Sequence, residues 1–137
     1  MTQVRKLATI MAVDIAGYSR SAERDEGAAA EGIGRLKLAL SEIGASRGGR
    51  IFNTAGDGVM LEFPTASAGL AAAADLMQRT DLPRVRIGLN LGEVIVDGDD
   101  LLGHGVNVAA RLQALADPGA TMISHNMSAQ AREHADL

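Results

Sequence analysis

The chain has 137 residues, which is the size of one ordinary domain and too short for two domains that each bury a core. Hydrophobic residues make up 47% and charged residues 22%, which is typical of a globular protein rather than a disordered one. The net charge of -4 lacks the positive excess that a phosphate backbone requires, and two Phe, one Tyr and no Trp leave few rings on which bases can stack. We therefore expect no nucleic-acid partner.

The sequence contains no cysteine and no segment typical of a signal peptide or a membrane span. No cysteine occurs, so disulfides, thiolate metal sites and cysteine nucleophiles are excluded together. Residues 1–20 carry several charges and no long apolar run, so we expect neither a signal peptide nor a membrane span. A cytoplasmic location is the default expectation.

The first half of the chain predicts a strand and a long helix. Residues 7–13 form a continuous apolar run that ends at Asp14, which indicates a strand buried on both faces. Apolar side chains recur at helical spacing from Ser21 to Ser46, and Gly48-Gly49 ends the pattern. One helix is therefore predicted over 21–46.

The middle of the chain predicts a hairpin, a helix and a strand. Residues 51–55 and 59–63 flank Gly56-Asp57-Gly58, where Asp-Gly is expected to supply positive φ. Thr65 is the expected cap of a helix that runs to about Arg79, and residues 85–96 read as one long strand.

The predicted order β-α-β-β-α-β defines an α+β, ferredoxin-like split sheet: antiparallel strands with both helices on one face. Residues 97–105 read as a polar loop. Helix 106–115, strand 121–124 and helix 128–134 follow as extra C-terminal α-β-α elements. We interpret residues 1–137 as a single domain.

Two acidic residues are candidate metal ligands. Asp14 ends the first strand and Asp57 lies at the hairpin tip, and the split topology brings those two places together. A pair of carboxylates without His or Cys suits Mg²⁺ that also binds phosphate and water. Asp57 between two glycines is equally a good turn residue. Asp14 needs a partner or a ligand, because an unpaired buried carboxylate is costly.

A second candidate site is a pair of polar residues on the helix predicted over 106–115. Asn107 and Arg111 are four residues apart, so they project from one face and can clamp a sugar and a phosphate. A solvated surface pair is the competing interpretation. The neighbouring alanines, Ala109 and Ala110, indicate that the helix backbone approaches something closely. The three histidines, His104, His125 and His134, have no spacing that builds a metal site.

Four stretches of the chain resemble the catalytic domain of class III nucleotidyl cyclases, of the bacterial adenylate cyclase type. They lie in the family's order and span nearly the whole chain. The stretches are Met11-Ala-Val-Asp-Ile-Ala-Gly-Tyr-Ser-Arg20, Gly49-Arg-Ile-Phe-Asn-Thr-Ala-Gly-Asp-Gly-Val-Met-Leu-Glu-Phe63, Arg86-Ile-Gly-Leu-Asn-Leu-Gly-Glu-Val94 and Asp100-Leu-Leu-Gly-His-Gly-Val-Asn-Val-Ala-Ala-Arg-Leu112.

The resemblance implies conversion of ATP to cyclic AMP and pyrophosphate with two Mg²⁺ or Mn²⁺ ions per site. It matches Asp14, Asp57 and the backbone carbonyl of Ile15 to the metal ligands. It also implies a head-to-tail homodimer, in which the metal residues come from one chain and the remaining site residues from its partner.

The resemblance assigns the other half of the site as well. Asn107 matches the residue that orients the ribose, and Arg111 matches the one that stabilises charge on the α-phosphate. Asp100 matches the position that accepts a hydrogen bond from the adenine amino group.

The sequence departs from the family at two places. Asn53 stands where active adenylate cyclases usually carry a base-reading lysine, which softens the selectivity between ATP and GTP. The family continues into further strands beyond the last helix, whereas this chain stops at Leu137, so it is either a truncated piece or binds the β- and γ-phosphates poorly. A non-catalytic or weakly active nucleotide-binding or dimerisation module, and a ferredoxin-like interaction domain without a nucleotide site, remain alternatives.

Overall fold

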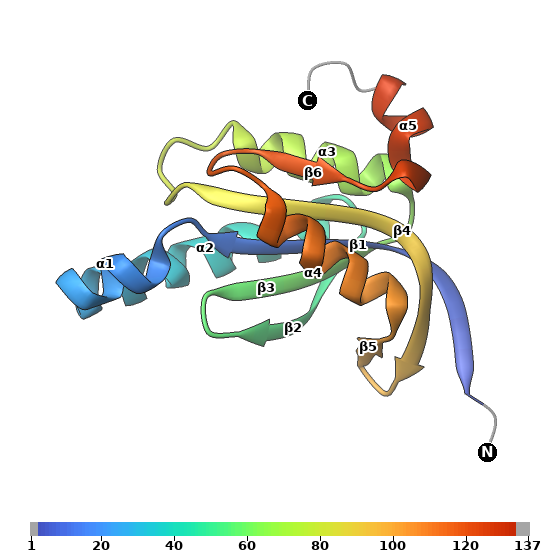
Figure 1. Ribbon diagram of the computed structural model, residues 1–137, viewed down its shortest axis with the longest axis horizontal. Helices are drawn as coiled ribbons and strands as arrows, with labels where there is room; N and C mark the ends of the chain where they lie inside the picture. The colour runs from blue at the N-terminus through green and yellow to red at the C-terminus, as the bar shows by residue number, and fades with distance from the viewer. Residues whose placement is uncertain (1–2, 134–137) are drawn as a thin grey trace.

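The computed structural model describes residues 3–133, which form a six-stranded sheet with helices on both faces (Figure 1). The strands are β1 (Val4–Ile15), β2 (Arg50–Ala55), β3 (Gly58–Phe63), β4 (Val85–Asp97), β5 (Asp100–Leu102) and β6 (Thr121–Ile123). The helices are α1 (Tyr18–Arg24), α2 (Glu26–Ser46), α3 (Ala66–Met77), α4 (His104–Leu115) and α5 (Ser128–Glu133), with a 3₁₀ turn, η1 (His125–Met127).

The strand order is β2-β3-β1-β4-β5, and these neighbours are all antiparallel. This confirms the split β-α-β-β-α-β sheet. Strand β6 adds to β4 in parallel, so the extra C-terminal elements extend the same sheet. The last helix was expected to reach His134, which lies outside the described residues.

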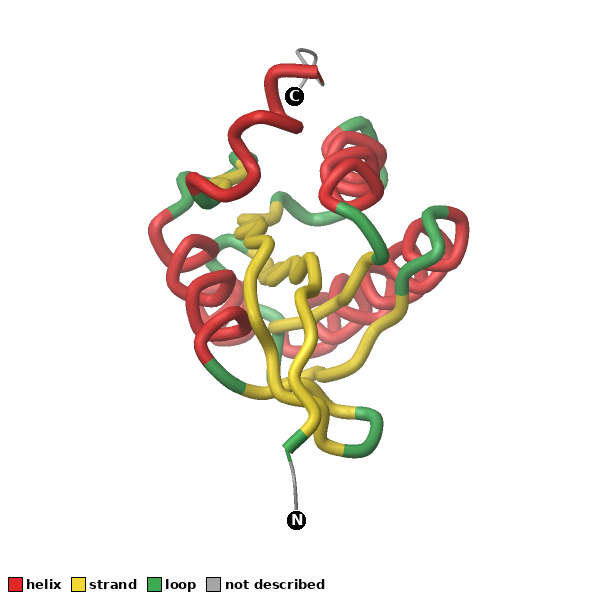
Figure 2. The backbone as a smooth tube through the Cα atoms, turned by 90° about the vertical axis from the view of Figure 1, so that its right-hand side faces the viewer, coloured by secondary structure: helices red, strands yellow, loops and turns green. Residues whose placement is uncertain are grey.

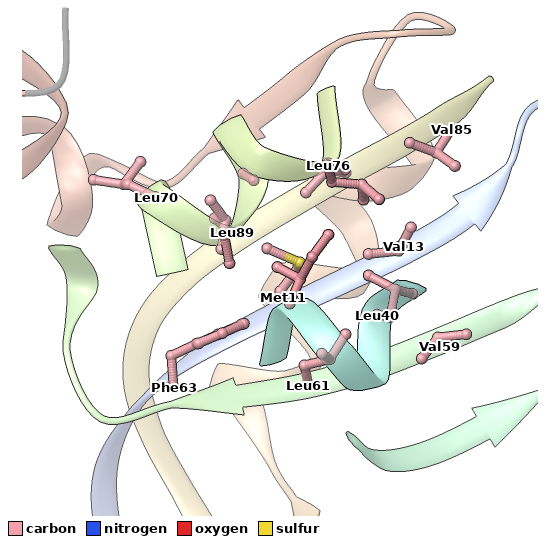
Figure 3. Close-up of a cluster of buried hydrophobic side chains, with 14 of the residues drawn as sticks. Met11, Val13, Leu40, Val59, Leu61, Phe63, Leu70, Leu76, Val85 and Leu89 are labelled. Atoms are coloured by element: carbon pink, nitrogen blue, oxygen red, sulfur yellow. The ribbon is translucent and has the colours of Figure 1, made fainter. Parts of the chain in front are cut away.

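Strand β1 lies at the centre of the sheet and is buried on both faces, as its apolar run predicts. Met11 and Val13 join the large core under α2 and α3, which also contains Leu40 and Leu70 (Figure 3). Alternate side chains point the other way, because strand side chains have a period of two. Ile10 belongs to a second, smaller core under α4.

The single helix predicted over 21–46 is wrong, because the chain forms α1 and α2 instead. Helix α1 begins at Tyr18, earlier than expected, and Asp25 between the two helices has extended backbone (φ -153°, ψ 93°). The Asp25 carboxylate accepts a hydrogen bond from the Ala28 amide at 3.0 Å. It therefore caps α2, a role for which aspartate is well suited.

Two further expectations need correction. In the hairpin, the positive φ belongs to Gly56 (φ 58°) and not to Asp57-Gly58, because the turn consists of Gly56 and Asp57 while Gly58 already belongs to β3. The loop predicted over 97–105 contains β5, which pairs with the end of β4 around a turn at Gly98 (φ 60°). A strand of three residues is too short to show an alternating pattern.

Helix α4 lies directly against the backbone of β4, on the sheet face opposite α2 and α3 (Figures 1 and 2). A side chain at Gly88 would collide with the Ala109 carbonyl oxygen and the Gln113 amide nitrogen. Ala109 itself is fully buried, which confirms the close approach expected from the sequence. Glycine at position 88 therefore fixes the depth at which α4 sits.

Candidate functional site

The end of β1 and the tip of the β2–β3 hairpin meet at an open cleft, which we call the acidic cleft. Asp14, Ile15 and Asp57 line it, together with Arg86 from β4 and residues of α1. The sheet register explains the meeting, because Val13 pairs with Val59 of the strand that follows the hairpin tip. The structure thus brings together the three residues matched to the metal ligands.

Arg86 is the residue of this cleft that the sequence analysis missed. It pairs with Asp14 across β1 and β4, and its guanidinium donates two hydrogen bonds to the Asp14 carboxylate, at 3.0 and 2.7 Å. Hydrogen bonding to Asp14 raises the pKa of Arg86, and the nearby charge of Asp57 raises it further. The partner that Asp14 requires is therefore this cation.

The acidic cleft fits a divalent ion that arrives with a polyphosphate. Within residues 3–133, no three His, Asp or Glu side chains cluster closely enough to hold a metal ion by themselves. Two carboxylates and one backbone carbonyl leave several positions of a Mg²⁺ shell to phosphate and water, which is how this ion is commonly bound with nucleotides. A cation at Asp14 would compete with the ion pair to Arg86.

A second pocket lies on the α4 side of the sheet, and we call it the amide pocket. Asn53 of β2 and Asn107 of α4 line it, with apolar walls that include Met60 and Leu101. Asp100 lies beside it: the Asn53 amide nitrogen is 3.5 Å from the Asp100 carboxylate. The same Asp100 oxygen accepts a hydrogen bond from the Leu101 amide at 2.8 Å.

A β-bulge explains why Asn53 faces this pocket. Ile51 pairs with Leu61, but Asn53 pairs with Met60, so Phe52 is an extra residue in β2. A regular strand would place Phe52 opposite Met60 and turn Asn53 towards α2, because side chains alternate between faces. The bulge therefore brings Asn53 to the same face as Asp100.

Asn107 and Arg111 are both exposed on α4. Arg111 lies one turn beyond Asn107 and lines neither the acidic cleft nor the amide pocket. The two cavities share no residue, so one chain carries the acidic residues in one place and the amide and guanidinium residues in another. Such a division suits a site completed by a second copy of the chain.

Comparison with known proteins identifies the family. A Rhizobium meliloti protein provisionally named adenylate cyclase 3 is 41% identical over 97% of this chain and 24% of its own length. The adenylate cyclase of Streptomyces coelicolor is 30% identical over 87% of this chain and 32% of its own length. The chain thus spans about a quarter to a third of these curated relatives. No family model matches it.

Comparison with solved structures points to the same family. A crystal structure described as an adenylate/guanylate cyclase/hydrolase from Silicibacter pomeroyi is 35% identical, with a TM-score of 0.82 over 97% of this chain and 84% of that one. Guanylyl cyclase domains at 20–22% identity share the fold. The chain belongs to the class III adenylyl/guanylyl cyclase catalytic domain family. No helix within the described residues combines the length and apolar character needed to cross a membrane.

Proposed function

We propose that the chain is a nucleotidyl cyclase domain that converts ATP to cyclic AMP and pyrophosphate in a head-to-tail homodimer. The observation that carries this proposal is the convergence of Asp14 and Asp57 at one cleft, in a family member that exposes Asn107 and Arg111 elsewhere. A symmetric dimer contains two such sites, each with the acidic cleft of one chain and α4 of its partner.

The acidic cleft holds the metal ions in this proposal. Asp14, Asp57 and the Ile15 carbonyl are the ligands of two Mg²⁺ or Mn²⁺ ions. When bound, such ions activate the ribose 3′-oxygen and stabilise the leaving pyrophosphate. If a metal ion took Asp14, the Arg86 guanidinium would be free to contact the polyphosphate, because a guanidinium matches phosphate oxygens as well as carboxylates.

Helix α4 of the partner supplies the groups that act on the sugar and the α-phosphate. Asn107 orients the ribose so that its 3′-oxygen lies in line with the phosphorus–oxygen bond that breaks. Arg111 stabilises the charge that develops on the α-phosphate during this displacement. Loss of one such well-placed transition-state donor costs on the order of 10²–10³ in rate.

The amide pocket and Asp100 recognise the base. Asp100 accepts a hydrogen bond from the adenine amino group, which favours ATP. The Asn53 amide can donate to adenine N1 or accept from guanine N1–H, so it discriminates less than a lysine would. Asn53 also lies within 3.5 Å of Asp100, so the two base-reading groups partly satisfy one another before a nucleotide arrives.

That same contact favours a second candidate function, a weakly active or non-catalytic cyclase-like module that binds nucleotide or dimerises. An assay of cyclic product from ATP and from GTP, with Mg²⁺ or Mn²⁺ and over a series of protein concentrations, separates the two. The proposed cyclase gives cyclic AMP with a specific activity that rises with concentration as dimers form. Calorimetric binding of metal–nucleotide without product would favour the module and refute the cyclase.

A further inference from the structure

Asn53 and Asp100 come from opposite edges of the sheet. In the order β2-β3-β1-β4-β5, three strands separate β2 from β5. The sheet twists and curls until these two edge strands meet on the α4 side, where Phe52, Met60 and Val96 fill the space. No backbone ladder joins β2 to β5 in the part of the chain that the structure describes, so side chains must hold the two edges together.

Arg50 makes the shorter of two hydrogen bonds that join these edges. Its Nη1 donates to the backbone carbonyl of Asp99 at 2.7 Å, whereas the Asn53–Asp100 contact is 3.5 Å long. Asp99 lies in the turn between β4 and β5, directly before Asp100. Because β5 has only three residues, this turn depends on outside contacts for its position against β2.

Neighbouring charges fix the Arg50 side chain. Its Nε donates to Glu62 at 2.7 Å, and Lys6 binds the other oxygen of the same carboxylate at 2.9 Å. The guanidinium also lies 6.0 Å from the centre of the Phe52 ring, within the range of a cation–π contact. Burial raises the pKa of Glu62, but hydrogen bonds from Lys6 and Arg50 outweigh it and the net pKa is lowered. Glu62 is therefore a charged anchor for the guanidinium.

We propose that Arg50 is a positioning residue for base selection: it holds the β4–β5 turn against β2 and so sets Asp100 opposite Asn53. The inference rests on the proposed function, since it concerns the same nucleotide site. Arg50 touches no reacting atom in this scheme. Its loss lets Asp100 move away from the base, so the preference for ATP over GTP falls while the metal residues and Arg111 are unaffected.

The test compares Arg50→Gln and Arg50→Lys with Arg5→Gln as the matched control. Arg5 also bridges two strands, through Glu93 at 2.9 Å, but does not contact the β4–β5 turn. Values of kcat and KM are measured for ATP and for GTP. We expect Arg50→Gln to lower the ATP-to-GTP ratio of kcat/KM about tenfold, because one charge-assisted hydrogen bond to the turn is lost. The change falls mainly on KM for ATP.

The controls separate positioning from general stability. Arg50→Lys retains one cation and should recover part of the ratio, and Arg5→Gln should leave it unchanged. If kcat falls equally for ATP and GTP and the ratio stays constant, Arg50 is merely structural and the inference is wrong.

Amide hydrogen exchange of residues 98–102 in the nucleotide-free protein provides an independent readout. Arg50→Gln should speed exchange in this segment and leave exchange in β1 unchanged. If the parent protein forms no cyclic product, the proposed function fails, but the positioning role is still decided by this exchange. Unchanged exchange at 98–102 overturns the role whatever the catalytic result.

Discussion

Gly88→Ala is expected to displace α4 from the sheet. The new methyl group would overlap the Ala109 carbonyl oxygen and the Gln113 amide nitrogen, and would lie 3.0 Å from the Gln113 Cα. All three atoms belong to helix backbone, so no side-chain rotation can relieve the collision. Ordinary carbon–carbon contacts are about 3.5–4.0 Å, and the overlaps with the oxygen and the nitrogen are more severe than the one with the Cα, so the helix must move by about 1 Å.

The cost in stability follows from the same geometry. Overpacking of a core costs about 1–3 kcal/mol, and rigid backbone obstacles place Gly88→Ala near 3 kcal/mol. For a chain of this size each kcal/mol lowers Tm by about 4 °C, so we expect a fall of about 12 °C in thermal unfolding followed by circular dichroism. Asn107 and Arg111 move with α4, so in the proposed cyclase we expect a misplacement of this size to lower kcat about 10²-fold.

Gly34→Ala is the matched control for this substitution. Gly34 lies in α2, and a side chain there meets no other atom within 4 Å. Alanine should therefore stabilise the protein by about 0.5–1 kcal/mol, as it does in helix interiors. If Gly88→Ala shifts the free energy of unfolding by less than about 0.5 kcal/mol, the close seating of α4 is wrong.

Three further predictions concern the charged residues. Asp57→Ala should be inactive alone, and Arg111→Ala should retain about 1% of the parent activity or less. Mixing the two variants should restore about a quarter of the parent activity, because half of the dimers are mixed and carry one intact site. No recovery in stable mixed dimers would contradict the head-to-tail arrangement. Arg86→Gln releases Asp14 from its ion pair, so it should tighten Mn²⁺ binding to the nucleotide-free protein severalfold, as measured by calorimetry. Unchanged or weaker binding would show that the ion pair does not compete with the metal ion. Glu62 has a pKa lowered from 4.5, so its contribution is present above that pH and is lost as the pH falls through the folded-state value. The stability gap between the parent and Glu62→Gln, measured by urea unfolding, should therefore shrink from pH 7 to pH 3, and a constant gap would contradict the ion-pair network.

Local patterns predicted most of the fold. The buried run of β1, the hairpin and the Thr65-capped helix each carry their own signal, and the Thr65 hydroxyl does accept from the Ala68 amide at 3.0 Å. The break at Asp25 was missed because an aspartate within a periodic segment can be either an exposed helical residue or a cap. Strand β5 was missed because pairing with β4, not alternation, defines it.

The candidate site was predictable only in part. Asp14 was identified as a charge that needs a partner, but its partner Arg86 is 72 residues away and follows from the β1–β4 register. The contact between Asn53 and Asp100 depends on the curl of the whole sheet and on the bulge at Phe52. The spacing of nearby residues encodes neither the Asp14–Arg86 pair nor the Asn53–Asp100 contact, so both were found only in the three-dimensional structure.

The unpaired residue in β2 affects how this chain should be compared with others. In this chain the residue opposite Met60 is Asn53, which lies two places after Ile51. In a relative whose second strand lacks the extra residue, the side chain opposite the equivalent of Met60 comes directly after the equivalent of Ile51. Matching such a chain letter by letter without a gap equates the aromatic ring of Phe52 with the true counterpart of Asn53. Inferences about nucleotide preference drawn from that column would then be off by one place, as would the positions that follow it in the strand.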